Sequence, residues 1–227
     1  MRQNRIEAEL PRLRWPVITL AACGLWLPLL GLMILALGVH NGTDWFFDVP
    51  LLLKLHAEAT PLRDHVFLFF SYVGYRYGVV PVGVMLVLTL CILRHRREAL
   101  FTAAALIGSA MLNYGCKQFF QRPRPVLWES IAPEISYSFP SGHSALSMAL
   151  ATTAMFLAWH TRWRWPILPI ASTFVVGVGL SRLYLGVHYP SDVLAGWCVA
   201  LAWVTGMYLM LFRWRRPWQP EAVQAHG

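Results

Sequence analysis

Polar and titratable residues stand at the ends of several strongly apolar segments of this 227-residue chain. The residues in question are Lys117, Arg124, Ser141, Gly142, His143, Arg182, His188 and Asp192. Polar groups beside hydrocarbon are costly, and where they occur they usually serve a function. Three cations, two histidines and one carboxylate in such places indicate a site that holds an anion and carries out chemistry on it.

Ser141, Gly142 and His143 open one of these apolar segments. Serine is a favoured N-cap, and glycine lets a ligand approach the backbone closely. The free amide donors and the helix dipole at such a start form an anion site. His143, in the first helical turn, is placed to donate a proton to a leaving oxygen as a general acid. The alternative is a histidine that only caps the helix or lies in the membrane interface.

Arg182, His188 and Asp192 lie between two further apolar segments, with a stiff Tyr189-Pro190 turn after the histidine. A carboxylate that accepts one imidazole N–H fixes the tautomer, so that the other ring nitrogen keeps a lone pair for nucleophilic attack. We therefore interpret His188 as a candidate nucleophile and Asp192 as its partner. The alternative is a purely structural hydrogen bond that ties two helices together.

Lys117 closes an apolar segment, and Arg124 follows in a proline-stiffened stretch where Pro125 favours an extended backbone. The forked donors of arginine and the point charge of lysine suit a tetrahedral phosphate. Arg122 is a further cation beside this pair, and one hypothesis is that it contacts the second phosphate of a diphosphate. The alternative for all three is a role as membrane anchors.

A metal site is the main chemical alternative, because two histidines and one carboxylate form a known ligand set for transition metals. The three neighbouring cations argue against it, since they would repel a divalent ion in a low-dielectric setting and attract a phosphate dianion. We therefore expect neither a metal nor another cofactor. The four cysteines have no metal-ligand spacing, and we interpret them as small packing residues.

Three spaced motifs occur in order along the chain: Lys117-x6-Arg124-Pro125, Pro140-Ser141-Gly142-His143 and Ser181-Arg182-x5-His188-x3-Asp192. This set resembles the signature motifs of the type 2 phosphatidic acid phosphatase family, also called the lipid phosphate phosphatase superfamily. The match has no substitution at the defining positions. Three ordered motifs are far harder to meet by chance than one.

The resemblance implies a metal-independent phosphatase that works through a phosphohistidine. On the matching positions, His188 resembles the nucleophile, Asp192 its orienting partner and His143 the acid that protonates the leaving group. The matching cations Lys117, Arg124 and Arg182 resemble the phosphate clamp. Ser141 and Gly142 are expected to add donors to the phosphoryl oxygens.

The composition predicts an all-helical membrane protein with a single domain over residues 1–227. Hydrophobic residues make up 57% of the chain and charged residues only 13%, whereas soluble domains carry about 25% charged residues. A span needs about 20 apolar residues, and six regions are expected to span, near residues 15–39, 77–93, 99–116, 141–159, 166–185 and 192–212.

Residues 41–76 are expected to form short interfacial helices, with Thr60 and Pro61 starting one of them. They act either as a connector over the bundle or as a lid for lipid entry.

Arginine and lysine are unevenly distributed between the two predicted sides, with twelve on the side of both termini and seven on the side of the motifs. The positive-inside rule then predicts cytoplasmic termini and an outward-facing site in a bacterial inner membrane. The net charge of +8 is mostly this topology signal, and nucleic acid is not an expected partner. The basic residues of the twelve-arginine side are Arg2, Arg5, Arg12, Arg14, Arg94, Arg96, Arg97, Arg162, Arg164, Arg213, Arg215 and Arg216.

The expected substrate is an amphiphile whose phosphate or diphosphate lies in the cationic site while its tail stays in the bilayer. Undecaprenyl diphosphate is the preferred candidate, because its recycling requires an outward-facing phosphatase. Phosphatidylglycerophosphate, phosphatidic acid and lipid A phosphates are the alternatives, the last with phosphotransferase chemistry. A transporter or scaffold with charges at its helix ends is the non-enzyme alternative.

Overall fold

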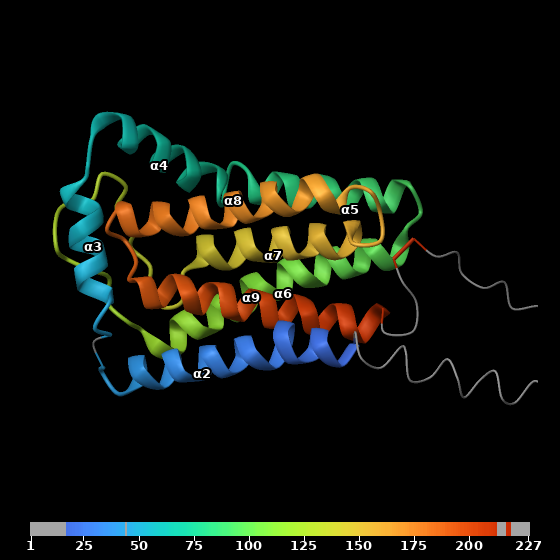
Figure 1. Ribbon diagram of the computed structural model, residues 1–227, viewed down its shortest axis with the longest axis horizontal. Helices are drawn as coiled ribbons and strands as arrows, with labels where there is room; N and C mark the ends of the chain where they lie inside the picture. The colour runs from blue at the N-terminus through green and yellow to red at the C-terminus, as the bar shows by residue number, and fades with distance from the viewer. Residues whose placement is uncertain (1–16, 44, 213–216, 219–227) are drawn as a thin grey trace, which may run out of the picture.

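The computed structural model describes residues 17–43, 45–212 and 217–218, and within these residues the regular structure is helical throughout. The elements are η1 (Ala22–Trp26, a π-helical turn), α2 (Leu27–His40), α3 (Asp48–Ala57), α4 (Pro61–Val73), α5 (Val79–Ile92), α6 (Arg96–Phe120), α7 (Gly142–Ala158), α8 (Arg164–Tyr184) and α9 (Pro190–Phe212). Figure 1 shows the long helices side by side as a bundle, with α3 lying across one end of it.

Four of the helical segments are long and apolar enough to cross a bilayer: Val17–His40, α6, α8 and α9. The helices α5 and α7 coincide with the other two predicted spans and are apolar, but they have only 14 and 17 residues. The all-helical prediction is therefore confirmed for the described residues, whereas six full-length spans are confirmed only in part. Trp15 and Pro16 of the first predicted span, and the basic residues predicted in both tails, lie outside the described residues.

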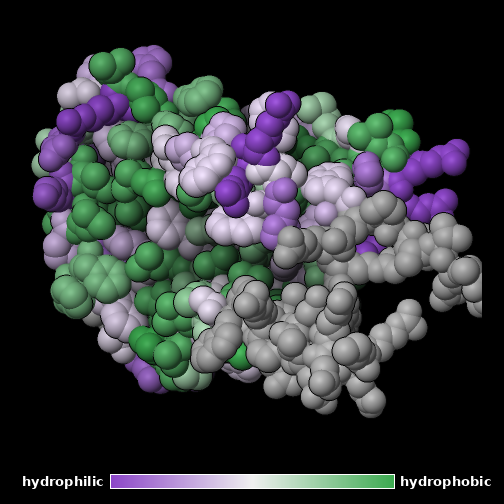
Figure 2. All heavy atoms as spheres, turned by 45° about the vertical axis from the view of Figure 1, so that its right-hand side comes forward, coloured by the Kyte–Doolittle hydropathy of each residue, from purple (hydrophilic) through white to green (hydrophobic). Residues whose placement is uncertain are grey.

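The outer surface of the helices is rich in exposed apolar side chains, among them Trp26, Met33, Met85, Ile107 and Ile170. Figure 2 shows hydrophobic side chains across much of the side of the bundle that faces the viewer. A water-soluble protein rarely exposes apolar surface on this scale, so the surface suits a lipid environment.

Small residues let the inner helices approach one another closely. Ala105 of α6, Ala145 and Ala149 of α7 and Ala200 of α9 are fully buried in one apolar cluster around Phe101. Small residues at helix contacts are typical of membrane bundles, where backbone proximity replaces the hydrophobic effect. This packing brings α6, α7 and α9 together along their length.

The segment between the first and second predicted spans contains two short helices, α3 and α4, as the sequence indicated. Thr60 caps α4 by accepting a hydrogen bond from the Arg63 backbone N–H at 3.3 Å, and Pro61 occupies the first turn. The helix α4 packs along α8, where the Phe70 ring covers Gly177 and Val178 lies against Gly74. A side chain at either glycine would collide with these neighbours, so the contact fixes α4 beside α8.

All motif-bearing helix ends meet at one end of the bundle, on the left in Figure 1, where α3 also lies. They are the end of α6, the start of α7, the end of α8 and the start of α9. The backbone N–H of Ser141 donates to the Asp192 carbonyl at 3.0 Å, and Gly196 permits this approach because a Cβ there would lie 2.6 Å from the Ser141 carbonyl oxygen. The starts of α7 and α9 are therefore held together directly.

Candidate active site

The imidazole of His188 lies between a carboxylate on one side and a cation on the other. Its Nδ1 is 3.5 Å from Asp192 Oδ2 and 3.3 Å from Ser138 Oγ, and its Nε2 is 3.1 Å from Arg124 Nη1. Arginine can only donate, so Nε2 is an acceptor and the ring hydrogen is on Nδ1. Nδ1–H then points to the Asp192–Ser138 pair, and Nε2 presents a lone pair.

Asp192 receives hydrogen bonds on both carboxylate oxygens. Ser138 Oγ donates to Oδ2 at 2.5 Å, the Tyr189 backbone N–H donates to the same oxygen at 2.9 Å, and Arg122 Nη1 donates to Oδ1 at 2.6 Å. A carboxylate that accepts hydrogen bonds from several donors is fixed in orientation. Ser138 was missed in the sequence, because an isolated serine in a loop gives no signal of its own.

His188 is an unusually buried histidine, with only 1% of its side chain exposed. Burial lowers its pKa well below the ordinary value, and the charges of Arg124 and Arg182 lower it further. The imidazole is therefore neutral at physiological pH. A neutral ring is the form that can act as a nucleophile.

Arg124 and Arg182 converge on one acidic side chain, that of Glu134. Arg124 Nη2 is 2.7 Å from Glu134 Oε2, and Arg182 Nη2 donates to Glu134 Oε1. Lys117 Nζ donates to the Tyr137 carbonyl and lies 3.4 Å from Ser136 Oγ, a group that Arg124 Nη2 also contacts at 3.0 Å. The three predicted cations thus lie around one small space. Within the part of the chain that the structure describes, Arg182 Nε is buried without an acceptor.

Glu134 also faces both candidate histidines. Its Oε1 is 3.6 Å from His143 Nδ1, and its Oε2 is 4.0 Å from His188 Nε2. Burial by itself raises the pKa of Glu134, but the charges of Arg182 and Arg124 outweigh it and hold the pKa below the ordinary value. An ionised carboxylate therefore occupies the centre of the cationic space. Glu134 lies outside the three motifs, so no role was predicted for it.

The start of α7 has the predicted geometry of a capped helix. Ser141 Oγ accepts from the Ser144 backbone N–H at 3.5 Å and from Ser144 Oγ at 3.0 Å. A Cβ on Gly142 would approach Asn113 Oδ1 to 3.3 Å, so the turn is tight. The His143 ring lies against Tyr75, with ring centroids 5.0 Å apart, and points to Glu134. Phosphate binding by Ser141 and Gly142 remains a prediction.

Arg122 does not belong to this group of cations. Its Nη1 contacts Asp192 Oδ1 at 2.6 Å and Ser191 Oγ at 2.8 Å, and its Nη2 contacts Asp48 Oδ2 at 2.9 Å. The guanidinium also lies 4.1 Å from the Tyr189 ring centroid. The buried carboxylates of Asp192 and Asp48 engage Arg122, which argues against the hypothesis that it contacts a second phosphate.

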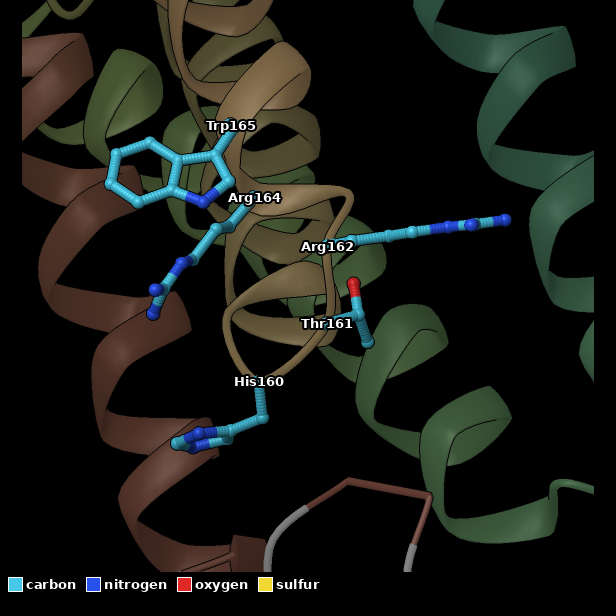
Figure 3. Close-up of a pocket in the computed structure, with 5 residues that line it drawn as sticks. All are labelled: His160, Thr161, Arg162, Arg164 and Trp165. Carbon is cyan, nitrogen blue, oxygen red and sulfur yellow. The ribbon is translucent and has the colours of Figure 1, made fainter.

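A separate pocket lies at the opposite end of the bundle, at the turn between α7 and α8. It is lined by His160, Thr161, Arg162, Arg164 and Trp165. Figure 3 shows that the side chains of Arg162 and Arg164 point in different directions. Basic groups that diverge do not form a clamp, so this pocket is not the candidate active site.

Comparisons with known proteins show which family the chain resembles. Residues 98–216 match the sequence profile of the PAP2 superfamily. The chain is 28% identical to phosphatidylglycerophosphatase B of Bacillus subtilis (strain 168), over 74% of this chain and 85% of that protein. It is 27% identical to undecaprenyl-diphosphatase of Sulfolobus acidocaldarius, over 79% of this chain and 87% of that protein.

A solved structure is also similar, that of a transmembrane PAP2-type phosphatidylglycerolphosphate phosphatase from Bacillus subtilis. Its TM-score is 0.72 and its sequence identity 27%, over 83% of this chain and 97% of that one. The profile match contains all three motifs completely. The chain belongs to the PAP2 superfamily.

Proposed function

We propose that this protein is a metal-independent lipid phosphate phosphatase that acts through a phosphohistidine on His188. The observation that carries the proposal is the convergence of His188, His143, Arg124 and Arg182 on one anionic group, the Glu134 carboxylate. Two guanidinium groups and two imidazoles around one anion are the groups that transfer of a phosphoryl group requires. The phosphatase names of the similar proteins support the same reaction class.

In the first chemical step, the Nε2 lone pair of His188 attacks phosphorus and the bond from phosphorus to the lipid oxygen breaks. His143 gives a proton to the leaving oxygen, so the lipid departs as an alcohol, or as a monophosphate if the substrate was a diphosphate. Asp192 stabilises the positive charge that the imidazole gains. Lys117, Arg124 and Arg182 stabilise the charge on the equatorial oxygens, with donors from Ser141 and Gly142.

In the second step, water attacks the phosphohistidine and the bond between Nε2 and phosphorus breaks. His143, deprotonated by the first step, takes a proton from the water. Orthophosphate leaves, and His188 returns to its neutral form with the hydrogen on Nδ1. The chemistry thus uses no metal, and the same two histidines serve both steps.

The substrate is proposed to be an amphiphile, with undecaprenyl diphosphate preferred. Phosphatidylglycerophosphate, phosphatidic acid and lipid A phosphates are the alternative substrates. The bundle is proposed to cross a bacterial inner membrane six times, with α5 and α7 as shorter spans and both termini in the cytoplasm. In this layout the single domain presents its site outward, and α3 and α4 lie in the outer interface.

The proposed function predicts phosphate release by the purified protein in excess chelator. The assay compares undecaprenyl diphosphate, phosphatidylglycerophosphate and phosphatidic acid side by side in one detergent. Equal rates with and without chelator are expected, because the cations of the protein replace a metal. Activity that falls on chelation and returns with a divalent ion contradicts the proposal, and absence of phosphate release from every lipid favours the transporter or scaffold alternative.

Arg122 and Asp48 are proposed to position Asp192 and thereby His188. Burial lowers the pKa of Arg122, but the attraction of Asp192 and Asp48 more than compensates, so the guanidinium stays charged. Arg122→Lys should lower kcat about 10- to 100-fold with little change in KM, because an ammonium group cannot bridge two carboxylates as a planar fork does.

The control for this substitution is Arg63→Lys, which changes an exposed arginine paired with Glu58 at 2.8 Å. The measurement is kcat and KM on a lipid monophosphate and a lipid diphosphate. A positioning role predicts the same loss on both substrates. A loss confined to diphosphates contradicts it and returns Arg122 to a phosphate-binding role.

A further inference from the structure

The carboxylate of Glu134 lies where the proposed reaction places the phosphoryl group. Oε1 faces Arg182 and His143, and Oε2 faces Arg124 and His188. Each oxygen is therefore shared by one clamp arginine and one catalytic histidine. These contacts are the ones that two phosphoryl oxygens need, so carboxylate and phosphate cannot occupy this position together. We call the position bounded by Arg124, Arg182, His143 and His188 the phosphate seat.

We propose that Glu134 is a built-in competitor for the phosphate seat and that it thereby sets which head groups the enzyme accepts. The inference rests on the proposed function and deepens it. A substrate binds productively only when its phosphate displaces the carboxylate from both arginines. A diphosphate carries more negative charge than a monoester, so it displaces Glu134 more readily. Glu134 is in this sense a specificity-determining residue and not a catalytic one.

The segment that carries Glu134 has the anchoring that such a displacement requires. Ser130 Oγ donates to the Leu185 carbonyl at 2.6 Å, and the Ser138 backbone N–H donates to the Arg122 carbonyl at 2.9 Å. Between these two anchors, Ile131 and Ile135 are exposed. Glu134 itself keeps 26% of its side chain exposed, against 1% for Arg182 and for His188. The side chains of Arg124 and His143 are 11% and 15% exposed. Glu134 is therefore the most exposed of the side chains at the seat, which is open to solvent mainly on its side.

The charges around the seat explain why both the Glu134 carboxylate and a phosphate are stable there. An empty seat would leave the Arg124 and Arg182 guanidinium groups unpaired in a largely buried space, which is costly. Glu134 supplies one negative charge to three cations, the two arginines and Lys117. A phosphate dianion supplies two charges and accepts hydrogen bonds on more oxygens, including one for the buried Nε of Arg182. The phosphate of the substrate therefore neutralises more of the positive charge of the three cations than Glu134 does.

The test is the binding of orthovanadate and orthophosphate to wild-type protein and to Glu134→Gln in detergent, measured by calorimetry without turnover. Glutamine keeps the size of the side chain but removes its charge. Both anions should bind about tenfold more tightly to Glu134→Gln, a change within the usual range of coupling between two competing groups. The control is Glu129→Gln, which makes the same charge change at an exposed position of the same connection and should bind both anions as wild type does.

A second readout is kcat/KM on a lipid monophosphate and a lipid diphosphate. Glu134→Gln should raise kcat/KM more for the monophosphate than for the diphosphate, because the monophosphate competes less well with the Glu134 carboxylate. Unchanged anion affinity in Glu134→Gln, or an equal gain in Glu129→Gln, overturns the inference. If Glu134→Gln does not fold, Glu134→Asp tests the same point, since its shorter side chain should compete less and raise anion affinity. Absence of lipid hydrolysis by the wild type refutes the proposed function, whereas the binding comparison still decides the role of Glu134.

Discussion

His188→Ala should lower phosphate release by at least about 10³-fold, because removal of a covalent nucleophile leaves only binding and electrostatic stabilisation. No other described side chain replaces it. His143 Nδ1 faces Oε1 of Glu134 and His188 Nε2 faces Oε2, so the two rings reach the seat from different directions. The measurement is kcat of purified protein on a lipid phosphate, with the folded fraction determined from thermal unfolding.

The control for this substitution is His65→Ala, which removes an exposed histidine of α4 whose Nδ1 lies 2.6 Å from the Pro61 carbonyl oxygen. That variant should keep wild-type turnover. If folded His188→Ala protein kept more than about a tenth of wild-type turnover, His188 would not be the nucleophile, because removal of a nucleophile lowers turnover far more than about tenfold.

Asp192→Asn is the second variant with a large expected effect, a loss in kcat of about 10³-fold with a small change in KM. Both oxygens of Asp192 face donors, Arg122 at Oδ1 and Ser138 with the Tyr189 N–H at Oδ2. An asparagine amide therefore directs its NH₂ group at a donor in either orientation. The neutral amide also fails to stabilise the imidazolium charge, and a comparable change in serine proteases costs about 10⁴-fold.

Binding of orthovanadate separates a chemical defect from a folding defect in Asp192→Asn. The clamp residues Arg124 and Arg182 do not contact Asp192 directly, so the variant should bind orthovanadate nearly as wild type does while its turnover is lost. Turnover within about tenfold of wild type would show that Asp192 has no orienting role, because the tautomer would then be set by Ser138 alone.

The sequence predicted the helices well because their signals are local. The spans follow from runs of apolar residues, and the starts of α4 and α7 follow from Thr60 and Ser141, whose side chains cap the helices as expected. The motif residues were expected to gather because they stand at helix ends, and helix ends that share a side of the membrane lie near one another. The helix α5, at Val79–Ile92, lies within two residues of the predicted bounds 77–93 at each end.

The missed features all depend on the path of loops. Glu134 and Ser138 lie in the connection between α6 and α7, and Asp48 lies at the start of α3. Each contacts residues far away in the sequence: Glu134 meets Arg182, and Asp48 meets Arg122 and Ser191. No spacing rule relates such pairs, because their distance is set by how the loop folds over the bundle. The contacts of Arg122 have the same origin, since it is close to Arg124 in sequence but pairs with Asp48 and Asp192.

The most direct test of the account is detection of the covalent intermediate. The protein is mixed with a lipid phosphate labelled on the transferred phosphorus, quenched in alkali during turnover and digested for mass spectrometry. The account predicts phosphate on His188, present in the wild type and absent from His188→Ala. A phosphate found on another residue, or rapid turnover with no phosphorylated protein at any quench time, would contradict it.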